Sequence, residues 1–314
     1  MDPITVFDKI KDAQCNNKSI TVLHDFFIDR IIKIKDLEEL FLRIKEKTKY
    51  RGGSIRGIAT TQFEGGNAVN IAYCLGKLGF DVDLFTITDN SSNMNLKYFF
   101  SDLPKVKLHL SYGKPGYTTS LEIHNSIDLK DSNIMISDVG DNSDFGPEKL
   151  NSHDNKAILN NSDAVILVNW ASNWKGNDLL KYVFQNSPKS LHFVDPADIQ
   201  TRSNEFCSLL RERNNMIDIL SINENECNSL LFELDLKRFS LCNEYNRNNI
   251  QLAVQELAKK LGVFIDLHTR YGCACSYVDE VYFEYNIKNT IIRNLTGAGD
   301  SWDAPLGRSA GRSA

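Results

Sequence analysis

The chain has 314 residues, of which 42% are hydrophobic, so it is long enough for one large domain or two modest ones with a full core. Its formal net charge is −5 and no block of basic residues stands out, which argues against binding to nucleic acid or to an anionic membrane surface. No apolar run approaches the length of a membrane span and the N-terminus lacks a signal-peptide core, so the sequence predicts no membrane segment.

The first half of the chain shows both helical and strand periodicities. Apolar residues between 36 and 48 recur at helical spacing, and a second apolar stripe ending before Gly79 predicts another helix. Segments 106–110 and 117–123 alternate apolar with polar residues, as strands that are wet on one face do, and they suit a small sheet standing apart from the core. The predicted elements are strands over 20–23, 82–87, 106–110 and 117–123 and helices over 36–48 and 67–78.

From residue 160 onward, apolar strands and amphipathic helices alternate. Segment 164–168 is an unbroken apolar run, as expected for a parallel strand covered on both faces. This alternation predicts an α/β fold, a doubly wound and mostly parallel sheet in one domain over 1–314, with binding sites at the carboxyl ends of the strands. The further predicted strands are 191–195, 217–221 and 263–267, and the predicted helices are 176–186, 203–214, 224–233 and 249–261.

The cysteines indicate a reducing compartment. There are seven, an odd number, scattered and without paired CxxC spacing, which is typical of free thiols in a cytoplasmic protein. Cys273-Ala274-Cys275 could contribute to a soft-metal site, but the pattern favours a strand with one face buried.

One glycine-rich stretch near the end of the chain carries the strongest chemical signal. Gly297-Ala298-Gly299-Asp300 predicts a tight turn whose backbone N–H groups, at the start of a helix, would bind an anion such as a phosphate. Asp300 could then accept a proton from a hydroxyl that attacks phosphorus. The alternative is an ordinary glycine turn with an Asp cap. The P-loop, dinucleotide, zinc-protease and GxSxG motifs are all absent.

An ordered set of motifs resembles the ribokinase-like, or PfkB, carbohydrate kinases. The set comprises a Gly-Gly-x-x-x-Asn-x-Ala segment at 65–72, Asp195-Pro196, an Asn-x-x-Glu element from Asn223 to Glu226, and the Gly-Ala-Gly-Asp turn. The resemblance implies an ATP-dependent kinase acting on a hydroxyl of a sugar or sugar-like substrate. The resemblance implies that Asp300 is the catalytic base. It also implies that the transferred phosphoryl group is stabilised by the backbone amides of Gly297, Ala298, Gly299 and Asp300.

The resemblance also implies the binding residues. Asp29 and Asn70 would bind sugar hydroxyls, with Gly65 and Gly66 allowing close approach of the backbone. The alternatives are a solvated carboxylate for Asp29 and a helix-surface side chain for Asn70.

On the nucleotide side, Asn223 and Glu226 would organise Mg²⁺ and the phosphates of ATP through water, with Glu226 as the metal-side carboxylate. The alternative is a helix cap in which Asn223 and Glu226 bond each other. Asp195 would be either a ligand-side residue or the cap of a turn before Pro196. Arg270 could meet a phosphate.

A small β-sheet lid formed by about 28–34, 55–63 and 105–124 would close over the sugar and exclude water. The family resemblance also allows a homodimer through this lid. A nucleoside kinase on the same fold, with Phe26-Phe27 stacking on a base, and a non-catalytic sugar-binding homologue are the alternatives.

Two stretches depart from the family pattern. Residues 267–272, Leu-His-Thr-Arg-Tyr-Gly, keep only the last glycine of the usual Thr-x-Gly-x-x-Gly, which leaves the nucleotide preference open. Residues 305–314 contain Gly-Arg-Ser-Ala twice without apolar periodicity, where the family has further helices. This tail is expected to lie outside the packed fold and to leave the adenine side open.

Overall fold

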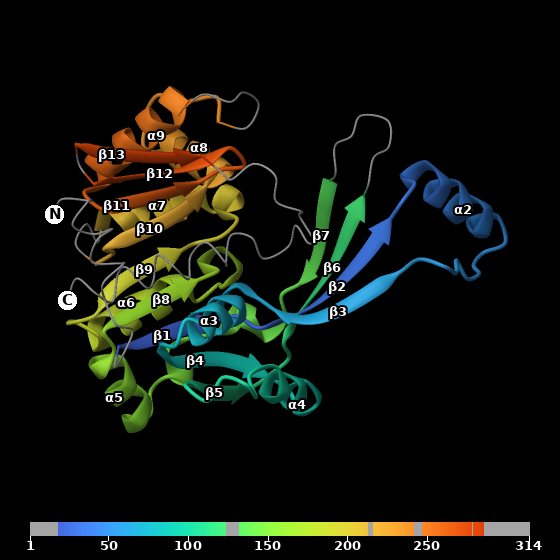
Figure 1. Cartoon of the computed structure of the whole chain (residues 1–314), viewed down its shortest axis with the longest axis horizontal. Coiled ribbons are helices and arrows are strands. Elements are labelled where there is room, and N and C mark those ends of the chain that lie inside the picture. Colours follow the sequence, from blue (N-terminus) through green and yellow to red (C-terminus); the bar gives the residue numbers. More distant parts are fainter. Residues whose placement is uncertain (1–17, 124–131, 213–215, 242–246, 278, 286–314) are drawn as a thin grey trace.

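Nine strands form the main sheet of the computed structural model, which describes residues 18–123, 132–212, 216–241, 247–277 and 279–285 (Figure 1). Seven strands are parallel, and the last two, β12 and β13, run antiparallel at one edge. In spatial order the strands are β13 (Glu280–Tyr285), β12 (Gly272–Tyr277), β11 (Phe264–His268), β10 (Ile219–Asn223), β9 (Leu191–Asp195), β8 (Ala164–Val168), β1 (Ser19–His24), β4 (Asp81–Thr88) and β5 (Val106–Tyr112).

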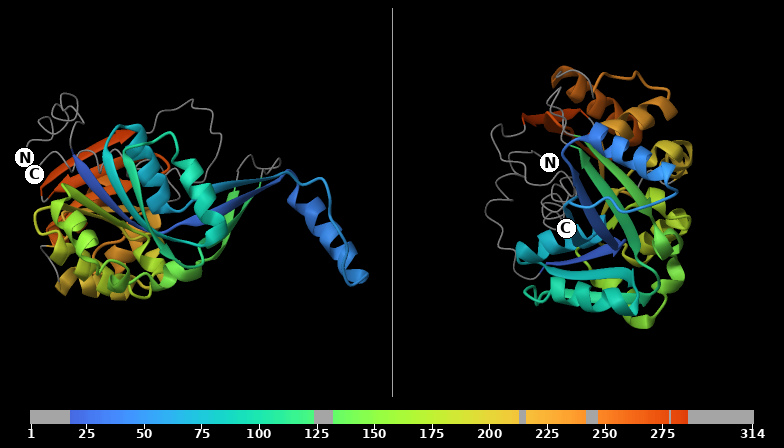
Figure 2. Two further views of the ribbon diagram at one scale, coloured as in Figure 1. Left: turned by 90° about the horizontal axis from the view of Figure 1, so that it is seen from below. Right: turned by 90° about the vertical axis from the view of Figure 1, so that its right-hand side faces the viewer.

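Helices cover both faces of the main sheet (Figure 2). Because successive side chains of a strand point to opposite faces, the sheet contributes to two separate cores: Ile20 and Val22 belong to one, and Leu23 belongs to the other. The first core contains side chains of α3 (Asn67–Lys77) and α4 (Asn90–Phe99). The second contains side chains of α5 (His153–Asn161), α6 (Gly176–Asn186), α7 (Ser203–Glu212), α8 (Glu224–Glu233) and α9 (Arg247–Leu261).

A separate four-stranded sheet, which we call the lid, projects from the main sheet (Figure 1). Its order is β3 (Thr60–Gly65), β2 (Phe27–Ile34), β6 (Gly116–Ile123) and β7 (Ser132–Asp138), with β2 and β6 parallel and both outer pairs antiparallel. Helix α2 (Leu37–Lys49) lies at the outer end of the lid. Asp36 caps α2 by accepting the backbone N–H of Glu39 at 2.9 Å.

The predicted doubly wound sheet with a small lid is confirmed, but one predicted lid segment is wrong. Residues 106–112 form β5, which pairs with β4 at the edge of the main sheet rather than in the lid. The alternation in this segment indicates a strand with one solvent-exposed face, and an edge strand of the main sheet can have such a face as well. Helices α4 and α5 and strand β7 were not predicted, because their polar sequences carry little periodicity. The predicted tail, 305–314, lies outside the described residues.

The cysteines and the helices can be examined in the described part of the chain. Its five cysteines are free, and Cys273 and Cys275 lie on β12, where burial raises their pKa to about 11 and about 12. Cys273-Ala274-Cys275 therefore belongs to a strand, as the alternation indicated. Within the described ranges, none of the helices has both the length and the apolar character needed to cross a bilayer.

Candidate functional site

The carboxyl ends of the parallel strands bring polar residues, among them the predicted Asp195 and Asn223, to one edge of the main sheet. Asp25 follows β1, Asp195 ends β9, and Asn223 ends β10. Beside β1 the strand order reverses, because β4 and β5 lie on one side and β8 to β11 on the other. In doubly wound sheets, ligands bind in the crevice at such a reversal.

Asp29 and Gly65 are in direct contact across the first two lid strands, where Phe27 pairs with Gly65 and Asp29 pairs with Phe63. A Cβ on Gly65 would lie 2.0 Å from Asp29 Oδ2, so any larger residue at this position would have to displace the carboxylate. Burial raises the pKa of Asp29 to about 6, although a hydrogen bond from Thr118 opposes the rise. The structure thus joins two of the predicted sugar-binding positions.

Gly66 begins helix α3 in a conformation that requires glycine. Its φ is 97°, and a Cβ would lie 3.0 Å from both the Asp25 carbonyl oxygen and the Phe27 nitrogen. The buried Asp25 carboxylate accepts the backbone N–H groups of the first two residues of α3, Asn67 and Ala68, at 2.9 Å each. Asp25 therefore caps the helix and holds its start against the end of β1.

Asn70 lies one turn into α3, where its backbone N–H donates to the Gly66 carbonyl at 3.0 Å and its residue is half-buried. It shares this first turn with Gly66, which lies against the backbone of Asp25, Phe26 and Phe27 where the lid joins the main sheet. Phe26 and Phe27 are buried, 0% and 7% exposed, so the predicted alternative in which they stack on a base is not supported by their positions.

Asn223 and Glu226 form a capping box at the start of α8. Asn223 Oδ1 accepts the Glu226 N–H at 3.1 Å, while Glu226 Oε2 accepts the Asn223 N–H at 2.9 Å and Oε1 accepts Asn223 Nδ2 at 2.7 Å. Glu226 is 1% exposed, and burial together with the nearby charge of Asp195 raises its pKa well above the usual range. The helix cap between Asn223 and Glu226, which the sequence left as an alternative, is therefore present, and the Glu226 carboxylate also experiences the charge of Asp195.

Asp195 shapes the turn that follows β9. Its Oδ1 accepts the backbone N–H of Ala197 at 2.9 Å, and Ala197 adopts a left-handed φ of 55°. The turn-capping alternative is therefore seen for Asp195. Its charge also helps to raise the pKa of Glu226, a residue of the first turn of α8.

Arg270 lies beyond β11 on an exposed turn next to α8. Its backbone N–H donates to Glu224 Oε1 at 2.8 Å, and the turn is closed by Thr269, whose Oγ1 donates to the Gly272 carbonyl at 2.7 Å. Because Asn223 and His268 are register partners, Arg270 is brought to the same strand ends as the capping box. Arg270 itself is exposed.

Asn169, which was not predicted from the sequence, connects Asp25 at the start of α3 with Asp195 at the end of β9. It directly follows β8 with a left-handed φ of 55°, and its Nδ2 donates to Asp25 Oδ2 at 3.0 Å. Its backbone N–H donates to the Asp195 carbonyl at 2.9 Å. The signal was available: a polar residue ending the unbroken apolar run 164–168 occupies the kind of position that predicted Asp195 and Asn223.

The predicted catalytic residues Gly297, Ala298, Gly299 and Asp300 lie outside the described residues. Among the residues that the structure does describe, no group of three or more His, Cys, Asp or Glu side chains is arranged to hold a metal ion.

The fold defines an α/β protein with polar residues at the carboxyl ends of its parallel strands and a separate lid sheet. A sequence model described as pfkB family carbohydrate kinase matches residues 37–304, most of the chain. The chain therefore belongs to the pfkB family of carbohydrate kinases, whose members use ATP. A search of curated proteins found no match.

Solved structures with 14–20% identity share this fold. The adenosine kinase from Sinorhizobium meliloti has 17% identity and a TM-score of 0.69, covering 94% of this chain and 88% of that chain. The ribokinase from Giardia lamblia has 14% identity and a TM-score of 0.68, covering 92% and 82%. The Arabidopsis thaliana ribokinase complexed with ribose and ATP has 20% identity and a TM-score of 0.62, covering 91% and 83%.

Proposed function

We propose that this kinase transfers the γ-phosphoryl group of ATP to a hydroxyl of a small sugar held between the lid and the start of α3. The observation that carries the proposal is the contact of the Asp29 carboxylate with Gly65. It places a partly buried acceptor beside a backbone with no side chain, which is the arrangement needed to accept a hydroxyl proton at close range. Asn70 is the second hydroxyl-binding residue.

Catalysis falls to Asp300 as the base, with the amides of Gly297, Ala298 and Gly299 binding the transferred phosphoryl group. These roles rest on the Gly-Ala-Gly-Asp motif and on membership in the family. The nucleotide side comprises Asn223, Glu226, Asp195 and Arg270, the last supplying a cation for a phosphate.

The acidic side chains at the nucleotide side fit a bound Mg²⁺. Glu226 and Asp195 repel each other in a buried setting, and a divalent cation would relieve that repulsion. Mg²⁺ keeps several waters and takes few protein carboxylates, so the absence of a three-acid cluster among the described residues is compatible with it. When bound, Mg²⁺ would neutralise charge on the phosphates of ATP.

A nucleoside is the second candidate for the acceptor, because an aromatic ring lies beside Asp29. Phe63 pairs with Asp29 across β2 and β3, on the same face of the lid, and it is 43% exposed. An exposed ring at that position could stack on a base. Ribose and adenosine are therefore the two probes that separate the candidates.

The lid also supports a homodimer. Ile134 and Ile136 lie on one face of β7 and are 50% and 62% exposed, which is unusual for two neighbouring isoleucines on a sheet face. We expect a second copy to cover this face. Light scattering of the wild type and of an Ile136→Lys variant would test it, and a monomeric wild type would contradict it.

The substrate assignment is tested by calorimetric titration of ribose and adenosine into Asp29→Ala and Asn70→Ala variants. Each change should weaken binding of the accepted substrate by about 1–3 kcal/mol, since a ligand hydroxyl loses its partner. Binding of an ATP analogue should change little. Unchanged affinity for the accepted substrate in both variants would refute the assignment.

A further inference from the structure

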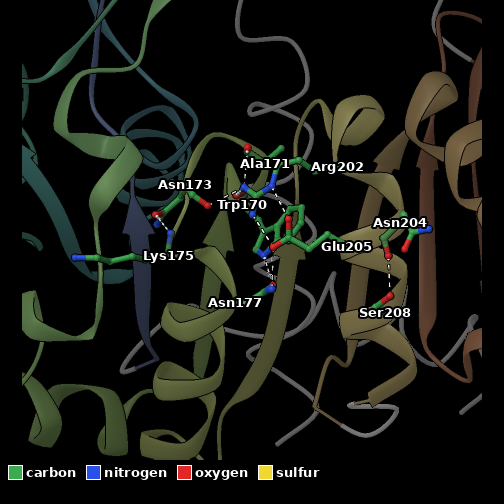
Figure 3. A network of polar contacts seen from close by, with 9 residues as sticks. All are labelled: Trp170, Ala171, Asn173, Lys175, Asn177, Arg202, Asn204, Glu205 and Ser208. Atoms are coloured by element: carbon green, nitrogen blue, oxygen red, sulfur yellow. Dashed lines mark hydrogen bonds and ion pairs between the residues drawn. The ribbon is translucent and has the colours of Figure 1, made fainter.

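Arg202 joins three backbone carbonyls and one carboxylate beside the strand ends (Figure 3). It follows the short 3₁₀ helix η4 (Ile199–Thr201) and its side chain is 10% exposed. Nη1 donates to the carbonyls of Trp170, Ala171 and Asn173 at 3.3, 3.0 and 2.8 Å. Nε and Nη2 donate to the two Glu205 oxygens at 2.9 and 2.8 Å. All of its donors are thus directed at one loop and one helix.

The groups around Arg202 close into a ring of contacts. Asn177 Nδ2 donates to Glu205 Oε1 at 2.9 Å, and Asn177 Oδ1 accepts the indole N–H of Trp170 at 3.0 Å. The Arg202 guanidinium lies 4.2 Å from the centroid of the Trp170 ring. Because guanidinium is planar and carries its donors in a fixed fork, this geometry fixes the 3₁₀ turn η3 (Trp170–Ser172).

The clamped turn begins at Asn169, whose side chain reaches Asp25. Asp25 in turn accepts the first two backbone N–H groups of α3, so the chain of contacts ends at the turn that carries Gly66 and Asn70. A backbone hydrogen bond, from the Ala171 N–H to the Pro196 carbonyl at 2.9 Å, also holds this turn, and it involves none of the side chains that reach Asp25. A displacement of η3 therefore moves Asn169 away from Asp25.

We propose that Arg202 is a positioning residue for the acceptor side of the site, acting through η3, Asn169 and Asp25 on the start of α3. The effect on substrate binding rests on the proposed role of α3 in holding the sugar. The effect on α3 itself does not, because the contacts from Arg202 to the α3 amides are independent of which substrate binds.

Three variants and one control test the proposal. Arg202→Met keeps an unbranched stem but removes the donors, and Arg202→Lys restores one charge without the fork. Asn169→Gly keeps the left-handed backbone and removes only the side chain that reaches Asp25. The control is Arg211→Met: Arg211 lies on α7, the helix that begins directly after Arg202, and donates to the carbonyl of Glu233 at 2.9 Å, away from η3.

Hydrogen exchange of the Asn67 and Ala68 amides is the first readout. Arg202→Met and Asn169→Gly should each speed their exchange about tenfold, because their acceptor Asp25 loses its anchor, while Arg211→Met leaves it near the wild-type rate. Arg202→Lys should lie between. In the double variant Arg202→Met/Asn169→Gly, these amides should exchange no faster than in Asn169→Gly alone, since both changes act through the Asn169–Asp25 hydrogen bond. Wild-type exchange at these amides in Arg202→Met, or additive effects in the double variant, would overturn the proposal.

Steady-state kinetics with ribose and adenosine gives the second readout. For whichever acceptor is turned over, Arg202→Met should raise its KM about tenfold and change the KM of ATP less than twofold. An equal rise for both substrates would indicate a purely structural role and overturn the proposal. If Asp29→Ala and Asn70→Ala leave acceptor affinity unchanged while the α3 amides still respond to Arg202→Met, the sugar-site assignment fails and the positioning role stands.

Discussion

Replacing Gly65 with alanine tests the contact on which the sugar site is built. The backbone of Gly65 is compatible with alanine, since its φ is not in the left-handed region, so the effect of the change is steric. The new Cβ would lie 2.0 Å from Asp29 Oδ2 and 2.7 Å from Asp29 Cγ, whereas Cβ contacts under 3.0 Å essentially do not occur. The carboxylate must therefore move by about 1 Å, a misplacement that can cost about 10²-fold in a positioned site.

The expected loss follows from the hydrogen bond that Asp29 would make to the substrate. An unpaired ligand hydroxyl costs about 1–3 kcal/mol, which corresponds to about 5- to 140-fold weaker binding. Calorimetry with ribose or adenosine measures the loss, and thermal unfolding measures the strain. In an Asp29→Ala background the clash disappears, so Gly65→Ala should have little further effect on either quantity.

Gly66→Ala provides the contrast. Its left-handed φ and its backbone neighbours make it destabilising whether or not Asp29 is present. The reasoning is refuted if Gly65→Ala binds the acceptor as the wild type does, or if it destabilises the Asp29→Ala protein as much as the wild type.

Three further outcomes are expected. Because Asp29 has a pKa of about 6 in the folded protein against an ordinary 3.8, the unfolded chain loses this proton first, and its contribution to stability is present below about pH 4 and lost as the pH rises to about 6. The rise in pKa from 3.8 to about 6 corresponds to about 3 kcal/mol of unfolding free energy. Chemical unfolding should therefore show the wild type losing up to this much stability relative to Asp29→Asn between pH 4 and 7, and a difference that stays constant with pH would contradict the expectation. Glu226→Gln retains a capping-box side chain and removes the repulsion with Asp195, so the melting temperature should hold or rise while the Mg²⁺ concentration for half-maximal rate increases; a lower melting temperature with unchanged Mg²⁺ dependence would assign Glu226 to the cap alone. Asp300→Asn should lower kcat about 10²-fold or more with sugar binding nearly intact, and near-normal turnover would remove Asp300 from the mechanism.

The sequence predicted most of the main sheet because its parallel strands are buried on both faces and read as unbroken apolar runs. Segment 164–168 shows this: all five of its residues are buried in β8. Alternating segments were less informative. The alternation in 106–112 could not distinguish an edge strand from a lid strand, because both have one wet face, and pairing partners are not encoded in the period.

The site was predicted residue by residue but not as a network. Asp29 and Gly65 were singled out separately, and only the register of β2 with β3 brings them together. Asn169 and Asp25 are 144 positions apart, so no local pattern could pair them. Arg202 and its ring of contacts arise from side-chain packing between α6, α7 and η3, which composition and periodicity do not report.

The connection between β1 and β2, which we call the root of the lid, joins the strand that carries Asp29 to the main sheet. Strand β1 ends at His24 and β2 begins at Phe27, so only Asp25 and Phe26 separate the main sheet from the lid. Asp25 accepts three hydrogen bonds, and the Phe26 carbonyl accepts Asn142 Nδ2 and the Gly116 N–H at 2.9 Å each. These hydrogen bonds hold the root in place, so we expect any closure of the lid to take place in its strands beyond this point. Asp29 is the third residue after Phe26 and lies against Gly65, so we propose that the acceptor site is already formed while the lid is open.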